Sequence, residues 1–96
     1  MLKSRKFLIF SISGCKMKIY DFNGKKNICG KRIHEARVKN KISQADLAAR
    51  LQIKGIMIER DSISRIEKGT RFVADYELMV IADILGVTIG WLLEIE

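Results

Sequence analysis

The sequence predicts an all-α fold, and three observations support this class. The 96 residues contain no proline and only 7% of them are aromatic, a composition that favours helices over strands. Beyond residue 27, apolar residues recur three or four positions apart, the spacing of one helical face. Glycines such as Gly69 and Gly86 stand where these runs end, as expected for left-handed helix stops. With 48% hydrophobic residues, the chain is expected to build the core of one small domain.

The first helix is predicted to begin after Asn27, whose side chain can cap it. Ile33 and Ala36 point inward on this helix, and Cys29 is a further candidate for the core. The helix is expected to end near Asn40, a residue type that tolerates the left-handed conformation.

The second helix begins with a clear capping signal. Ser43 is the cap, and Asp46 takes the place of the usual glutamate three residues later. Leu47, Ala48 and Leu51 form the apolar stripe that follows. A short helix with one buried face is therefore expected.

The stretch QIKGIMIER, residues 52–60, connects the second and third helices. Gly55 interrupts the helical pattern, while Ile53, Ile56 and Ile58 are apolar enough to be packed. We predict an extended connection, with room for one more helical turn before the glycine. A short strand is the alternative, because the stretch after the glycine is β-prone.

Three more helices are predicted in the second half of the chain. The third ends on Gly69 and turns Ile63 and Ile66 inward. The fourth stops at Gly86 and has acidic residues in its first turn, where the helix dipole favours negative charge. Its apolar residues are Leu78, Ile81, Ala82 and Leu85, and the acids are Asp75 and Glu77. Thr88 caps a short last helix that carries Ile89, Trp91, Leu92 and Leu93.

Residues 1–26 are set apart as an N-terminal arm in front of a domain at residues 27–96. The opening stretch MLKSRKFLIFSISGC resembles a bacterial lipoprotein signal peptide with Cys15 as the lipidated residue. Its apolar run is too short to span a bilayer, and Met17 offers a second start directly afterwards. We therefore favour a disordered arm or an over-extended start, with export as the alternative.

The charge distribution and the cysteine spacing limit the classes of function that the chain can have. All 18 basic residues but only 6 of the 11 acidic ones lie in residues 1–71. This imbalance favours an anionic partner, with an ordinary solvated surface as the alternative. Cys15 and Cys29 lack CxxC spacing and neighbouring histidines, which favours reduced thiols in a cytoplasmic protein over a disulfide or zinc site. We expect no metal or cofactor, and we expect His34 to be solvated.

The third predicted helix has two faces of opposite character. Ile63 and Ile66 point inward, so the side facing away from them carries polar residues, namely Arg60, Asp61, Ser62 and Arg65. A short helix with such a face fits the major groove of DNA. Arg65 can donate a pair of hydrogen bonds to O6 and N7 of guanine.

Contacts with the DNA backbone are predicted beside this helix. Gln44, the first residue of the second helix, can donate to a phosphate next to the N–H groups of that helix. Lys68, Thr70 and Arg71 follow the third helix and suit the sugar-phosphate backbone. The predicted partner is therefore double-stranded DNA.

Three stretches resemble the phage-repressor and Cro-like helix-turn-helix family, also called the XRE family: KRIHEARVKNKISQADLAARL, ISRIEKGTR and ILGVTIGWLL. The resemblance implies a five-helix lambda-repressor-like domain that binds palindromic operators as a dimer and controls transcription. It implies that DNA is faced by Gln44, Arg60, Asp61, Ser62 and Arg65, and that residues 68–71 touch the backbone. It further implies a buried ion pair between Arg37 and Glu67.

Two departures from the family pattern matter. The turn between the second and third helices is usually tight, whereas QIKGI makes it longer here. Glu59 occupies the capping position of the third helix, where serine or threonine is usual. Asp61 therefore has two interpretations: it caps the helix, or it accepts a hydrogen bond from N4 of cytosine.

The favoured function is a sequence-specific transcriptional regulator, namely a repressor. The alternative is an antitoxin-type module that binds a protein partner, with Tyr76, Met79 and Val80 either forming the partner surface or, as we favour, belonging to the core. An enzyme is not expected, because Ser62 and Ser64 have no plausible base and no metal-binding or phosphate-binding motif is present. A membrane role is not expected either.

Overall fold

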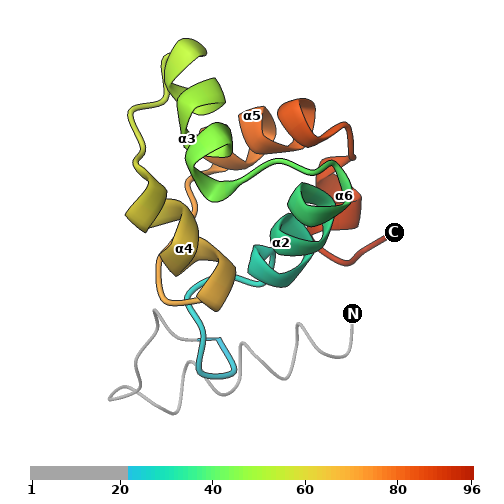
Figure 1. The fold of residues 1–96 in the computed structure, drawn as a ribbon. Coiled ribbons are helices and arrows are strands. Elements are labelled where there is room, and N and C mark those ends of the chain that lie inside the picture. Colours follow the sequence, from blue (N-terminus) through green and yellow to red (C-terminus); the bar gives the residue numbers. More distant parts are fainter. Residues whose placement is uncertain (1–21) are drawn as a thin grey trace.

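This computed structural model describes residues 22–96, a part of the chain that folds into five helices joined by short connections (Figure 1). They are α2 (Gly30–Lys39), α3 (Gln44–Ile53), α4 (Arg60–Lys68), α5 (Asp75–Leu85) and α6 (Ile89–Leu92). That part contains no strand, and its one isolated β-bridge joins Phe22 to Lys25. The all-α, five-helix prediction is confirmed, and the arrangement is consistent with a lambda-repressor-like fold. The expectations for Cys15 and Met17 lie outside the described residues.

The core is built from apolar residues of all five helices and the connection between α3 and α4. Its fully buried side chains are Ile33, Leu47, Leu51, Ile58, Ile63, Ile66, Ile81 and Leu92. α2 lies between α4 and α6, and α3 packs against both α4 and α5 (Figure 1). The predicted inward stripes therefore meet in one core, and burial of this apolar surface fixes α4 against the rest of the domain.

Two of the predicted N-terminal caps are present. The Oγ of Ser43 accepts a hydrogen bond from the backbone N–H of Asp46 at 3.0 Å. The Oγ1 of Thr88 accepts one from the N–H of Trp91, also at 3.0 Å. Each bond satisfies one of the N–H groups that a helix leaves unpaired in its first turn.

The helix ends agree with the sequence at both glycines and differ at α2. Gly69 and Gly86 adopt left-handed conformations, with φ of 82° and 71°. Asn40 does not, because its φ is −86°, and Lys41 carries the left-handed turn at φ 57°. The Nδ2 of Asn40 instead donates to the carbonyl oxygen of Leu85 at 3.1 Å, so a tertiary contact holds this side chain.

The connection between α3 and α4 is extended and forms no strand. Ile58 is buried and Ile56 is packed against the core, but Ile53 is 85% exposed, so the prediction for Ile53 was wrong. The Nε2 of Gln52 donates to the carbonyl oxygen of Ile58 at 2.7 Å. This bond and the burial of Ile58 attach the long turn to the domain directly before α4.

Two exposed side chains on α5 correct another expectation. Tyr76 and Met79 are 57% and 55% exposed, so they do not belong to the core, whereas Val80 is packed against it.

No helix within residues 22–96 has the length and apolar character needed to cross a bilayer.

The first turn of α2 makes a close approach to the C-terminal end of α4. A Cβ added at Gly30 would stand 2.1 Å from the carbonyl oxygen of Ile66. That oxygen belongs to the backbone, so it cannot swing aside as a side chain can. Glycine is therefore required at this position by the packing of α2 on α4.

Gly30→Ala is expected to destabilise the domain by about 1–3 kcal/mol, the usual range for overpacking, even though alanine is intrinsically the better helix former. Urea unfolding of both proteins measures the difference. Gly90→Ala is the matched control, since a Cβ there would meet the side-chain carboxylate of Glu96, which can move. Equal stability of Gly30→Ala and the wild type would contradict the close approach.

Candidate nucleic-acid interface

α4 separates its apolar and polar residues onto two faces. Ile63 and Ile66 are 0% exposed, while four polar residues of the helix are exposed: Arg60, Asp61, Arg65 and Lys68. Ser62 is half-buried. The helix therefore fixes itself to the core by two isoleucines and turns both of its arginines toward solvent.

The first turn of α4 lacks a side-chain cap. Glu59 is the N-cap residue and makes no capping hydrogen bond. Asp61 lies inside the first turn, so it does not occupy the capping position. Its carboxylate lies 3.7 Å from the Nη2 of Arg60, and both side chains are largely exposed. Such surface pairs contribute little, so both groups remain free to bind a ligand.

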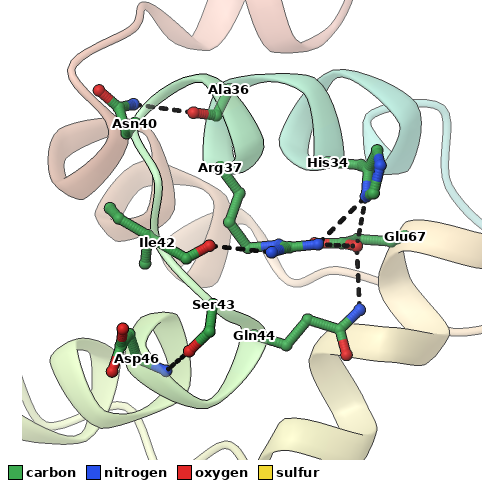
Figure 2. Close-up of polar contacts among 9 residues, drawn as sticks. All are labelled: His34, Ala36, Arg37, Asn40, Ile42, Ser43, Gln44, Asp46 and Glu67. Atoms are coloured by element: carbon green, nitrogen blue, oxygen red, sulfur yellow. Dashed lines mark hydrogen bonds and ion pairs between the residues drawn. The ribbon is translucent and has the colours of Figure 1, made fainter.

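Glu67 of α4 is the centre of a polar cluster (Figure 2). Its carboxylate accepts from the Nε of Arg37 at 2.6 Å and from the Nη2 of Arg37 at 3.0 Å. The two side chains are 10% and 6% exposed. A third nitrogen of the guanidinium donates to the carbonyl oxygen of Ile42 at 2.9 Å. The pair thus joins α2, α4 and the turn before α3.

Two further residues complete this cluster. The Nε2 of Gln44 donates to the Oε1 of Glu67 at 3.0 Å, and the Nδ1 of His34 lies 2.9 Å from the same oxygen. His34 is about half exposed, as expected of a solvated residue, but it also has this partner. Gln44 is therefore held against α4 at the first position of α3. Its predicted contact with a phosphate remains a prediction.

The cluster sets the ionisation of Glu67. Burial raises the pKa of this carboxyl, but hydrogen bonds from Arg37, His34 and Gln44 outweigh burial and hold the pKa below its usual value. The bond to Glu67 likewise raises the pKa of Arg37. Both members of the pair are therefore charged at neutral pH.

A depressed carboxyl pKa makes stability depend on pH. We expect the contribution of Glu67 to be fully present above about pH 4.3, the ordinary glutamate value. It should be lost as the pH falls through the lower pKa of the folded state. Melting temperatures from neutral pH down to acid test this, and Glu67→Gln should show a shallower decline than the wild type. Identical pH profiles would contradict the assignment.

The loop after α4 holds the remaining predicted contacts. Lys68 and Thr70 are exposed, and the Oγ1 of Thr70 donates to the carbonyl oxygen of Arg65 at 3.3 Å. Arg71 differs, because its Nη1 and Nη2 donate to the two carboxylate oxygens of Glu77 at 3.0 and 3.1 Å. Arg71 therefore has a structural partner within the domain, and its predicted contact with a phosphate is untested.

Glu77 was not predicted from the sequence as a partner of Arg71 or as a helix cap, although its position in the chain indicates a cap. It is the third residue of α5, and Ala74 at the N-cap has no side chain that could cap the helix. The Oε1 of Glu77 accepts from the N–H of Ala74 at 3.0 Å. A glutamate at this position supplies the second half of a capping box, and Arg71 uses the same carboxylate.

Asn27 links three segments at the C-terminal end of α4. Its Oδ1 accepts from the N–H of Gly30, the first residue of α2, at 2.9 Å, but the N-cap residue is Cys29 and not Asn27 as predicted. Its Nδ2 donates to the carbonyl oxygens of Ile66 and Arg71 at 3.1 and 2.7 Å. No local sequence pattern indicates these two longer-range bonds.

Residues 22–96 offer no group of three or more histidine, cysteine or acidic side chains that could hold a metal ion. Cys29 is buried in the core, and its burial raises the pKa of the thiol to about 11. The thiol is therefore protonated at neutral pH, which suits an apolar core residue better than a ligand or nucleophile.

The packing of α3 and α4, with the exposed arginines of α4 turned outward, defines a helix-turn-helix protein. The family model described as the helix-turn-helix domain matches residues 30–95, so the chain belongs to this family. Membership indicates a DNA-binding regulator of transcription, a class that is typically not enzymatic. No curated protein and no solved structure gave a significant match.

Proposed function

We propose that the protein is a sequence-specific, double-stranded DNA-binding repressor that places α4 in the major groove. The observation that supports this most directly is the division of α4 into two faces. Ile63 and Ile66 are completely buried, whereas Arg60 and Arg65 are exposed. A helix held in this way can enter a groove with its arginines toward the base edges.

Each polar residue of the interface has a proposed role. Arg65 reads guanine through a pair of hydrogen bonds, and Arg60 and Ser62 contact bases or phosphates nearby. Asp61 accepts from N4 of cytosine, since it is exposed and lies beyond the capping position. Gln44, Lys68, Thr70 and Arg71 contact the backbone and fix the register of α4.

The size of α4 supports binding as a dimer. α4 spans nine residues, so one copy can contact only a short half-site. Helix-turn-helix proteins extend the site by binding as dimers, with half-sites about one helical turn of DNA apart. We propose a homodimer on a palindromic operator that blocks transcription by occupying it.

Selection of binding sequences from a pool of random duplexes tests this function. The proposal expects a palindromic consensus, two chains per selected duplex, and tighter binding to it than to a shuffled duplex. The affinity should fall steeply with salt, with a slope of about −0.9 per neutralised phosphate in a log–log plot. Recovery of no consensus, or equal binding to both duplexes, would remove the sequence-specific part of the proposal.

A second candidate is an antitoxin-type module that binds a protein partner and represses its own operon. Exposed apolar side chains outside α4 favour it. They are Ile53 at 85%, Met57 at 82%, Tyr76 at 57% and Met79 at 55% exposure. Co-expression with the product of the adjacent gene tests this candidate, since an antitoxin should co-purify with that product. Its absence from the purified protein would favour the simple repressor.

A further inference from the structure

The segment just before α2 forms a tight turn that ends in two lysines. Phe22 and Lys25 exchange backbone hydrogen bonds of 2.7 and 3.0 Å. Asn23 and Gly24 between them both have positive φ, 54° and 79°, the combination of a type I′ turn. Asparagine followed by glycine is the pair that most readily adopts this turn. The turn therefore holds Lys25 and Lys26 in a defined direction.

This turn is attached to the end of α4 and to the loop that follows it (Figure 1). The N–H of Lys26 donates to the carbonyl oxygen of Gly69 at 2.8 Å. Asn27, the next residue, holds the carbonyl oxygens of Ile66 and Arg71. The first bond joins two backbone groups, and the other two join the Asn27 side chain to backbone carbonyls. Together they fix the position of the turn relative to the proposed DNA-binding helix.

The two lysine side chains lie on the α4–α5 loop. A Cβ added at Gly69 would meet the Cδ of Lys25 at 2.7 Å, so the aliphatic part of Lys25 rests on that glycine. The Nζ of Lys26 lies 5.5 Å from the centre of the Phe72 ring. Lys25 therefore lies on the residue between Lys68 and Thr70, the exposed residues proposed to contact the DNA backbone, and Lys26 lies over the same loop.

Neither lysine is neutralised within residues 22–96. Both are exposed, and no carboxylate in that part of the chain forms an ion pair with either. Glu67 and Glu94 line the same surface hollow as Lys25, but the carboxylate of Glu67 is occupied by Arg37 and Glu94 forms no ion pair with Lys25. Together with Lys68 the turn adds a cluster of unpaired positive charge at one end of α4.

We propose that this turn is a second contact with the DNA backbone, in which the ammonium groups of Lys25 and Lys26 each bind a phosphate next to the one held by the α4–α5 loop. The inference rests on the proposed DNA binding by α4. The competing explanation is that the lysines only stabilise the C-terminal end of α4, where the helix dipole favours cations. If the lysines bind phosphates, removing their charges should lower the affinity for DNA. If they only stabilise the helix end, removing their charges should lower the stability of the domain.

The test compares two variants of the full chain that each lose two lysine charges. One is Lys25→Gln/Lys26→Gln. The matched control is Lys39→Gln/Lys54→Gln, because Lys54 pairs with Asp83 of α5 and Lys39 lines a hollow with Leu85 and Gly86, away from α4. Affinity is measured on a random-sequence duplex over a series of salt concentrations, and melting temperatures are recorded for both variants.

Lys25→Gln/Lys26→Gln is expected to bind roughly 10- to 50-fold more weakly near 0.1 M salt, with a salt slope shallower by about 1–2 units. Its melting temperature should stay close to that of the wild type, and the control should bind almost as the wild type does. An unchanged slope and affinity, a lower melting temperature without weaker binding, or an equal loss in the control would each overturn the proposal. Binding of the wild type to neither random nor selected duplexes would instead contradict DNA binding by α4 itself. Failure of the lysine contact can therefore be told apart from failure of the proposed function.

Discussion

Glu67→Ala is expected to lower the free energy of unfolding by about 3–5 kcal/mol, the usual effect of removing one partner of a buried ion pair. The reason is that Arg37 keeps its charge and stays 10% exposed, now without the carboxylate that receives two of its hydrogen bonds. Gln44 loses its acceptor and His34 loses a polar partner at the same time. Urea unfolding at neutral pH measures the change.

Glu35→Ala provides the control, because Glu35 is an exposed acid on α2 and its removal should change stability by less than about 0.5 kcal/mol. A double variant, Arg37→Met/Glu67→Leu, separates the pair from simple loss of packing. It should recover part of the stability, since replacing both charges by apolar groups leaves no buried charge unpaired, although the carbonyl oxygen of Ile42 loses its bond from Arg37. A Glu67→Ala protein as stable as the wild type would show that the pair is not buried in solution.

Arg65→Ala is expected to weaken binding to a selected operator by about 1–3 kcal/mol, or about 5- to 150-fold in Kd, the range for losing one pair of hydrogen bonds to a guanine. The side chain is exposed and has no ion pair within residues 22–96, so the fold should be unaffected. Binding to a random duplex should fall much less, because random sequences seldom place guanine at the required position.

Lys68→Ala is the companion variant to Arg65→Ala. It should weaken binding to operator and random duplexes equally and reduce the salt slope by about one unit. Arg71 is less suitable for this purpose, because its replacement also breaks the contact with Glu77 and would mix stability with affinity. Equal losses on both duplexes for Arg65→Ala would contradict its proposed role in reading bases.

Much of the fold could be predicted because its signals are local. The cap at Ser43 and the stops at Gly69 and Gly86 depend on a few neighbouring residues, and all three are present. Ile53 shows where this reasoning fails. Its apolar side chain suits a core position, yet it is 85% exposed. The path of the chain after α3 depends on the burial of Ile58 in the core, which no local pattern around Ile53 indicates.

Of the candidate interface, only the outward-facing residues of α4 could be predicted from the sequence. Ile63 and Ile66 define the inner face of α4 by spacing alone, and the arginines then fall on the other side. The partner of Arg71 could not be found in this way, because Glu77 and the loop must fold before the two meet. The bonds of Asn27 to Ile66 and Arg71 span 39 and 44 positions, so no local pattern indicates them.

The sequence by itself determined the five helices, the caps at Ser43 and Thr88 and the division of α4 into an apolar and an arginine-bearing face, because helix periodicity and capping act over a few residues. The tertiary structure decided which polar groups stay available for a ligand. It engaged Gln44 and Arg71 with carboxylates, left Arg65 exposed, and brought Lys25 beside the end of α4. Those outcomes depend on contacts between segments far apart in the chain, which exist only once the common core has formed.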